Sequence, residues 1–327
     1  MEADILAPCI IVAVRIAPMT SERWPVAARV ISGTEIAREV RREVSERVAE
    51  MRAKHGIAPG LAVVLVGDDP ASAVYVRNKE RAATEAGMVS ETEQLPASAT
   101  QEEVLSAVHR LNGDTRIHGM LVQLPLPEHI DEDAVIDAID PYKDVDGLHP
   151  YNMGLLMAGR PRFVPATPAG IQRMLLRSGI DPEGKHVVIC GRSKIVGKPV
   201  FNLLMQRAAG ANATVTVCHT RTRDLPEVTR QADILIAAIG QPRYITADMV
   251  KEGVVVIDVG INQIEAPERK RGYRLVGDVD YGPVSEKAAA ITPVPGGVGP
   301  MTIAMLLNNT LDAAQYYMHP RPREHQK

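Results

Sequence analysis

The chain has 327 residues, a length that suits about two domains of roughly 150 residues each. Hydrophobic residues make up 45% and charged residues 24%, the usual balance of a globular protein. The 37 basic and 40 acidic residues give a net charge of −3, and the aromatic residues are only eight Tyr, two Phe and one Trp. This composition argues against a nucleic-acid partner, because phosphate contacts need a basic surplus and base stacking needs aromatic rings.

The three cysteines, Cys9, Cys190 and Cys218, are too few and too scattered for a disulfide framework. We therefore expect a reducing, cytoplasmic environment. No Cys/His spacing indicates a zinc site, so we expect no metal.

The two ends of the chain are predicted to lie outside the fold. The N-terminal apolar run, residues 5–14, is far shorter than the roughly 20 residues that span a bilayer, so we expect no membrane partner. We interpret residues 1–26 as a peripheral extension, with Met19 as a candidate natural start, and residues 318–327 as a tail.

Helix and strand patterns alternate from Ser32 onward. Apolar residues spaced by three or four predict a first helix that Gly56 ends. Continuous apolar runs of strand length are typical of parallel sheets, whose strands are buried on both faces. The elements that follow are a strand at 61–66, a helix from Pro70 to about Gly87, a strand at 89–95, a helix at 101–111 and a strand at 119–124.

A second series follows the loop at 140–150. It comprises a helix from Thr167 to about Arg177, a strand at 187–190, a turn at 191–198, a helix at 199–209, strands at 214–218, 234–238 and 254–258, and a helical stripe at 303–314. This order predicts an α/β protein of two lobes, with the last helix free to return to the first lobe.

A glycine turn, Gly191-Arg-Ser-Lys-Ile-Val-Gly197, joins a predicted strand to a predicted helix. Backbone N–H groups at such a helix N-terminus attract phosphate, and Arg192 and Ser193 add further donors. The G-x-G-x-x-G pattern is absent, however, so the turn alone fits an ordinary connection equally well.

The strand at 214–218 bears on the choice of cofactor. NAD-binding units usually place an acidic residue about 20 residues after the glycine turn, where it holds the ribose diol. Here His219, Thr220 and Arg221 follow the strand, and the first acid is Asp224. Hydroxyl and guanidinium groups can bind a 2′-phosphate, so this pattern favours NADP over NAD.

Ser72, Tyr75 and Lys79 share one face of the helix after Pro70. Their spacing alone is more typical of a solvated face with an extended lysine. The functional alternative is a ligand site, because the helix follows the carboxyl end of a predicted strand, where open α/β sheets bind ligands.

Three further segments carry polar groups or glycines in suggestive positions. Gln123 ends a predicted strand just before a proline-rich loop. Asp144 and Asp146 lie in the loop between the lobes and fit solvated turn acids better than a metal pair, because no third ligand has a suitable spacing. The glycine loop at 293–302 runs into a helix and permits close backbone approach to a flat ligand.

Five long motifs occur in one order: Tyr75-Val-Arg-Asn-Lys79, Val122-Gln-Leu-Pro-Leu-Pro127, Asp144-Val-Asp-Gly147, Gly191-Arg-Ser-Lys-Ile-Val-Gly197 and Pro293-Val-Pro-Gly-Gly-Val-Gly-Pro-Met-Thr302. Over about residues 27–317 the chain closely resembles the bifunctional methylenetetrahydrofolate dehydrogenase/methenyltetrahydrofolate cyclohydrolase family.

The resemblance implies oxidation of 5,10-methylenetetrahydrofolate with NADP and hydrolysis of the methenyl product to 10-formyltetrahydrofolate, in one-carbon metabolism. It implies a folate lobe at 27–148 plus 300–317, and a Rossmann-like, doubly wound NADP lobe at 149–299. The active-site cleft is expected between the lobes. A homodimer through the NADP lobes is also implied.

The resemblance also assigns residue roles. Lys79 becomes the catalytic lysine, Gln123 its partner, Tyr75 the ring stacked near the pterin and aminobenzoate, and Asp146 the pterin anchor. Further substrate contacts are expected from Pro295, Gly296 and Gly297. Cofactor contacts are expected from Gly191, Arg192, Ser193, Ile195, His219, Thr220, Ile261 and Thr302.

Three alternatives remain open from the sequence. One is a relative that uses NAD or lacks the hydrolysis. Another is a two-lobe amino-acid or shikimate-type dehydrogenase, which would not require Gln123 and Asp146 as a pair. The third is a folate-binding protein without catalysis, against which the retention of Lys79 argues.

Overall fold

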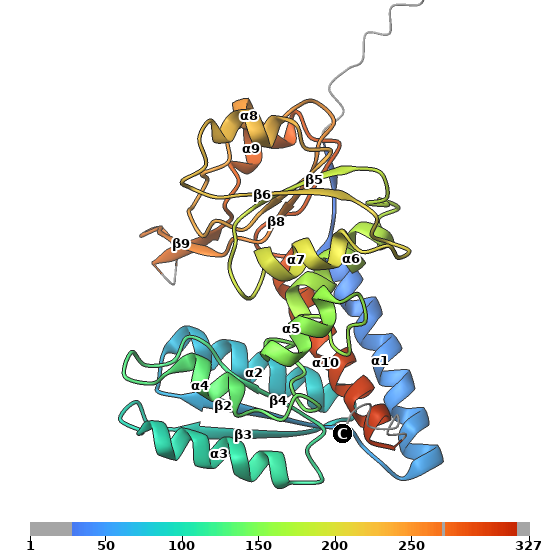
Figure 1. Ribbon diagram of the computed structural model, residues 1–327. Helices are drawn as coiled ribbons and strands as arrows, with labels where there is room; N and C mark the ends of the chain where they lie inside the picture. The colour runs from blue at the N-terminus through green and yellow to red at the C-terminus, as the bar shows by residue number, and fades with distance from the viewer. Residues whose placement is uncertain (1–27, 270–271, 319–327) are drawn as a thin grey trace, which may run out of the picture.

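The computed structural model describes residues 28–269 and 272–318. The predicted extension at 1–26 lies outside these residues. So does the predicted tail at 318–327, except for Met318, which is the last residue of the C-terminal helix. The described chain forms two lobes, each built on its own parallel sheet, so the predicted α/β class is confirmed (Figure 1). In the described part of the chain, no helix has the length and apolar character needed to cross a membrane.

The first lobe contains a three-stranded parallel sheet in the order β3-β2-β4. All seven residues of the central strand β2 are buried, and they alternate between two cores. Leu61 and Val63 pack in the core formed with α1, α2 and α10, whereas Ala62 and Val64 pack in the core formed with α3. The elements of this lobe are α1 (Gly33–His55), β2 (Gly60–Val66), α2 (Pro70–Glu85), β3 (Val89–Leu95), α3 (Gln101–Gly113), β4 (Gly119–Val122) and α4 (Glu132–Asp137).

The predicted helix boundaries in this lobe follow from local capping groups. The side chain of Ser32 accepts the N–H of Glu35 at 3.3 Å to begin α1, and Gly56 ends it with φ 68°. Asp69 accepts the N–H of Ser72 at 2.7 Å to begin α2, with Pro70 at the first helical position. These caps fix where the side chains of α2 emerge along the helix.

The second lobe contains a six-stranded parallel sheet in the order β1-β11-β8-β7-β5-β6. Strand β6 lies on one side of β5 and β7 on the other, and all three are parallel, so the order in which strands are added to the sheet reverses at β5. This confirms the predicted doubly wound, Rossmann-like arrangement. The strands are β1 (Arg29–Val30), β5 (His186–Cys190), β6 (Thr214–Cys218), β7 (Ile234–Ala237), β8 (Val255–Asp258) and β11 (Ala290–Ile291).

The remaining elements cover this sheet or join the two lobes. They are α5 (Pro150–Met157), α6 (Ala166–Arg177), α7 (Gly197–Leu204), α8 (Leu225–Arg230), a 3-10 turn at Ala247–Met249, an antiparallel hairpin of β9 (Asn262–Glu265) and β10 (Tyr273–Val276), α9 (Tyr281–Ser285) and α10 (Val298–Met318).

The structure contains α4, α5, α8, α9 and the β9–β10 hairpin in addition to the predicted elements, and the predicted elements themselves differ from the structure at several points. The helix predicted to reach residue 209 ends at Leu204, because a turn follows in which the N–H of Asn212 bonds to the carbonyl of Gln206. Strand β1 falls in the range predicted for the first lobe but pairs with β11 of the large sheet. Helix α10 packs on α1 of the first lobe, to which the last helix was expected to return, and also on α6 (Figure 1), and thus connects the lobes.

Candidate active site

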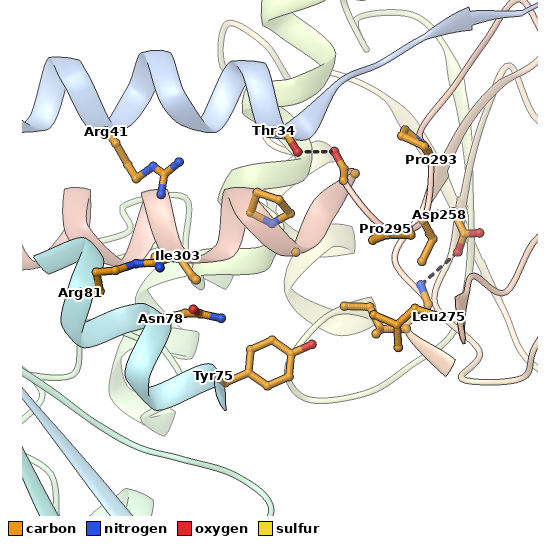
Figure 2. Close-up of a pocket in the computed structure, with 17 residues that line it drawn as sticks. Thr34, Arg41, Tyr75, Asn78, Arg81, Asp258, Leu275, Pro293, Pro295 and Ile303 are labelled. Atoms are coloured by element: carbon orange, nitrogen blue, oxygen red, sulfur yellow. Dashed lines mark hydrogen bonds between the residues drawn. The ribbon is translucent and has the colours of Figure 1, made fainter. Parts of the chain in front are cut away.

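A cavity of about 340 Å³ lies between the two lobes, within the size range of small-ligand sites. Helices α1 and α2 form one wall, and the loops after β8 and β11 form the other (Figure 2). Five residues predicted to contact substrate or cofactor line this cavity: Tyr75, Ile261, Pro295, Gly296 and Gly297.

The start of α1 packs tightly against the glycine loop that follows β11. The backbone N–H of Thr34 donates to the carbonyl of Gly296 at 3.0 Å, and its hydroxyl donates to the same oxygen at 3.3 Å. A Cβ on Gly33 would lie only 1.8 Å from the carbonyl oxygen of Gly297. Glycine at position 33 therefore allows the close backbone approach that shapes this wall.

Lys79 and Gln123 are brought together from α2 and from the end of β4. Lys79 donates from Nζ to Oε1 of Gln123 at 2.9 Å, and Gln123 donates from Nε2 to the carbonyl of Leu124 at 2.7 Å. The second bond orients the amide so that its oxygen faces the lysine. Lys79 is only 9% exposed, although its helix begins at the surface.

Burial lowers the pKa of Lys79 below its ordinary value, and the nearby carboxylate of Asp146 opposes this effect. Burial also raises the pKa of Asp146, and the Lys79 ammonium opposes that change. Desolvation disfavours both charged forms, while the attraction between the two groups favours them. Lys79 is therefore coupled to Gln123 by a hydrogen bond and to Asp146 by charge.

The two carboxylates of the interlobe loop have different environments. Asp144 is 1% exposed and accepts hydrogen bonds from the backbone N–H groups of Gly147, Leu148 and His149 and from the side chain of Asn152, at 2.8–3.2 Å. Its acceptor capacity is used within the protein. Asp146 interacts electrostatically with Lys79 instead. Asp144 therefore holds the turn together, whereas the carboxylate of Asp146 is the one available for chemistry.

The glycine turn after β5 lies at the point where the strand order reverses. Gly191 has φ 137°, and a Cβ there would lie 2.1 Å from the carbonyl oxygen of Ala238, in the loop after β7. The side chains of Arg192, Ser193 and Ile195 are exposed. In open α/β sheets, this carboxyl-end crevice is where nucleotides bind.

The end of β6 presents the residues predicted to meet the cofactor's ribose. His219 is fixed by local bonds: its N–H donates to Oγ1 of Thr222 at 3.0 Å, and its Nδ1 accepts the N–H of Arg221 at 3.1 Å. Thr220 is exposed. Thr302 lies elsewhere, at the start of α10, where its hydroxyl is 2.9 Å from that of Thr167.

Family models match most of the described chain. Residues 31–146 match the catalytic domain of tetrahydrofolate dehydrogenase/cyclohydrolase, and residues 165–318 match its NAD(P)-binding domain. This chain belongs to the tetrahydrofolate dehydrogenase/cyclohydrolase family. The second match includes α10, although that helix also packs on the first lobe.

Individual members of the tetrahydrofolate dehydrogenase/cyclohydrolase family are similar over nearly their full length. The bifunctional protein FolD of Dehalococcoides mccartyi is 57% identical over 88% of this chain and 97% of its own. The FolD crystal structure from Campylobacter jejuni has a TM-score of 0.83 and 46% identity, covering 89% of this chain and all of that one. FolD from Trypanosoma brucei, complexed with NADP and an inhibitor, has a TM-score of 0.86 and 41% identity, covering 90% of this chain and 99% of that one.

Sequence reasoning missed two groups of residues in this family member. Arg41, Asn78 and Arg81 line the cavity, but on their helices they look like ordinary polar positions. Asp258 and Asp278 are both buried. In the sequence, Asp258 could have been noticed as an acid at the end of an apolar strand, and Asp278 as a second acid in the segment after β10. No group of three or more His, Cys, Asp or Glu arranged to hold a metal occurs in residues 28–269 and 272–318.

The two buried acids organise the second wall of the cavity. Asp258 accepts the N–H groups of Gly260, Asp278 and Val279 at 2.9–3.0 Å, and burial raises its pKa to about 7. Asp278 accepts the N–H groups of Ile239 and Gly240 at 2.6 and 2.8 Å. Together they tie the loops after β7, β8 and β10 to one another.

Proposed function

We propose that this chain oxidises 5,10-methylenetetrahydrofolate with NADP and hydrolyses the resulting 5,10-methenyl group to 10-formyltetrahydrofolate, in one-carbon metabolism. The observation that supports this most directly is the buried Lys79, which is hydrogen-bonded to Gln123 and influenced by the charge of Asp146. Lys79 lies one helical turn from Tyr75, which lines the interlobe cavity. Residues 27–148 with 300–317 would bind the folate, and residues 149–299 would bind NADP.

The residues around the glycine turn fit a dinucleotide with a 2′-phosphate. Gly191 lets the chain turn at the crevice, and the exposed Arg192, Ser193 and Thr220 offer donors to phosphate oxygens. Between the end of β6 and Asp224 no acid would repel a 2′-phosphate. NADP, when bound, supplies the hydride acceptor for the methylene carbon.

The folate lobe supplies the groups that would orient the substrate. The pterin edge carries an N–H and an amino group side by side, a fork that one carboxylate accepts in bidentate fashion. Asp146 is assigned to this role because the carboxylate of Asp144 is already occupied by the turn. Tyr75, 40% exposed on α2 and pointing into the cavity in Figure 2, is assigned to stack on the substrate's rings.

Lys79 is assigned the proton transfers of the hydrolysis. Loss of hydride leaves a methenyl cation, and a cation about 4 Å from the ammonium costs on the order of 4 kcal/mol at an effective dielectric of 20. This repulsion acts in the same direction as the burial that already lowers the pKa of Lys79. The neutral amine would take a proton from the attacking water and return one to the departing pterin nitrogen.

We further propose a cytoplasmic homodimer that forms through the NADP lobe. Strand β6 is the edge of the large sheet, and Val217 on it is 38% exposed. An edge strand carries unpaired backbone groups that a second copy can cover. Cys190 and Cys218 are free and buried in the described chain, consistent with a reducing compartment.

The decisive experiment measures both products from methylenetetrahydrofolate with NADP or NAD, for the wild type and Lys79→Met. We expect NADP-dependent methenyl formation followed by formyl product in the wild type. The Lys79→Met variant should lose hydrolysis while binding NADP with an unchanged Kd, because Lys79 lies on α2 and outside the glycine turn. Hydrolysis within threefold of wild type in Lys79→Met would refute the assigned base.

A further inference from the structure

One end of the interlobe cavity is basic. Arg41 on α1 and Arg81 on α2 line it together with Asn78, and Figure 2 shows both guanidinium groups directed into the space between the two helices. Among the residues that line this cavity, Asp258 is the only acid, and it lies at the opposite end beside Leu275. Tyr75 lies between the two ends.

The protein itself does little to neutralise these two guanidinium groups. Arg81 Nε lies 3.8 Å from Glu85 Oε1, and both side chains are largely exposed, so the pair is weak. Within residues 28–269 and 272–318, neither guanidinium donates a hydrogen bond to a protein acceptor. Arg41 is nonetheless partly buried. Two converging, unneutralised guanidinium groups in a cavity are typical of a carboxylate or phosphate site.

The position of the two arginines relative to Tyr75 indicates which anion they meet. Arg81 follows Tyr75 by six residues, about 9 Å along the helix axis. With the aminobenzoate stacked on Tyr75, its amide-linked glutamate extends beyond the ring by about one residue length, ~3.5 Å, to the α-carboxylate. The γ-carboxylate lies a side-chain length farther. Both carboxylates then come within the reach of arginine side chains.

We infer that Arg41 and Arg81 bind the glutamyl carboxylates of the folate substrate and thereby set its preference for glutamylated over unglutamylated pterins. The inference rests on the proposed function, which places the aminobenzoate at Tyr75. Asn78, one helical turn from both Tyr75 and Arg81, is positioned to donate from its amide to the same group. A cofactor phosphate is the other anion of suitable chemistry, but the glycine turn at Gly191 belongs to the second lobe.

The test compares 5,10-methylenetetrahydrofolate with 5,10-methylenetetrahydropteroate, which lacks the glutamate. Arg41→Gln and Arg81→Gln should each raise KM for the folate about tenfold, the loss of one charged hydrogen bond, with kcat within twofold. KM for the pteroate should not change. In the double variant the two substrates should be used about equally well.

Arg42→Gln and Arg77→Gln are matched controls, since both residues are exposed on the same two helices and neither lines the cavity. They should leave both KM values unchanged. Equal losses on both substrates in the Arg41 and Arg81 variants would overturn the inference, because they would indicate a structural role. An increase in KM for NADP with unchanged folate kinetics would overturn it by assigning a cofactor phosphate to the pair.

The activity of the wild type distinguishes failure of this inference from failure of the proposed function. If the wild type oxidises neither substrate, the proposed function fails and the inference with it. If the wild type is active and the double variant retains full discrimination between the two substrates, only the inference is overturned.

Discussion

Lys79 Nζ lies 2.9 Å from Gln123 Oε1, while Nε2 of the same amide is held 2.7 Å from the carbonyl of Leu124. The lysine therefore meets a neutral acceptor whose orientation is fixed. A neutral partner favours the ammonium form less than a carboxylate would, so burial can keep the pKa of Lys79 below its ordinary value.

Gln123→Glu should therefore inactivate the hydrolysis near neutral pH. The new carboxylate raises the pKa of Lys79, and the pH profile of the cyclohydrolase rate should move to higher pH, with at least a tenfold loss at pH 7. Gln123→Leu is the control, since it removes the hydrogen bond without adding charge. A lower rate with the same alkaline shift in both variants would show that charge is not the cause.

Lys79→Met should change how stability depends on pH. The folded state releases the Lys79 proton at a lower pH than the unfolded state, whose lysine titrates near 10.5. Between the two pKa values the unfolded state binds more protons, so the free energy of unfolding rises with pH, by at most about 1.4 kcal/mol per pH unit. Urea unfolding at pH 7.5 and 9.5 should show this gain in the wild type and a smaller gain in Lys79→Met.

The comparison isolates one group, because Lys143, whose pKa burial also lowers, is present in both proteins. Asp146 titrates with the opposite sign, because its raised pKa starts from 3.8 and its stabilising contribution is lost as pH rises toward the folded pKa. Both proteins are therefore compared in the Asp146→Asn background. An identical slope in the two proteins would mean that Lys79 is protonated in the folded state throughout this range.

Asp146→Asn should impair folate binding, whereas Asp144→Asn should impair stability. Asp146→Asn removes one acceptor of the proposed pterin fork, and an unpaired donor in a closed site costs roughly 1–3 kcal/mol. Folate affinity should fall about tenfold to a hundredfold and both activities should fall with it, with little change in Tm. Asp144→Asn places an amide N–H₂ against backbone donors and should lower the unfolding free energy by about 2 kcal/mol. Activity loss confined to Asp144→Asn would reverse the two assignments.

Thr220→Asp should shift the cofactor preference. Its carboxylate would repel a 2′-phosphate at the end of β6 and accept hydrogen bonds from a ribose diol instead. KM for NADP should rise at least tenfold while KM for NAD stays the same or falls. A wild type that already prefers NAD would contradict the proposed role of this strand end.

Gly191→Ala should damage both the turn and cofactor binding. The added Cβ would lie 2.1 Å from the carbonyl oxygen of Ala238, at a φ of 137° that side chains rarely adopt. We expect a lower Tm and a KM for NADP raised at least tenfold. Gly253→Ala is the control, because its φ is 77° and a Cβ there meets no atom within 4 Å. It should lower Tm only slightly and leave KM for NADP unchanged.

Local signals in the sequence determined the main helices and strands. The run Leu61–Val66 predicted a strand buried on both faces, and alternate residues of β2 do face two different cores. Gly56 predicted the end of α1 and Pro70 the start of α2, because such residues act on backbone groups only a few residues away. The motifs around Lys79 and Gly191 likewise indicated the family, since each is contiguous in the chain.

The tertiary structure decided which of these elements meet. Periodicity marks which face of a helix is apolar, but it does not specify the partner of that face. The packing of α10 on both α1 and α6, and the pairing of β1 with β11, therefore could not be obtained from pattern alone. The same limit applies to the site: Gln123 is 44 residues from Lys79, and Arg41 is on a different helix from Arg81. Only the folded chain shows that Asp144 is buried and hydrogen-bonded within its turn while Asp146 interacts with Lys79. Burial and hydrogen-bond partners depend on residues that folding brings together in space.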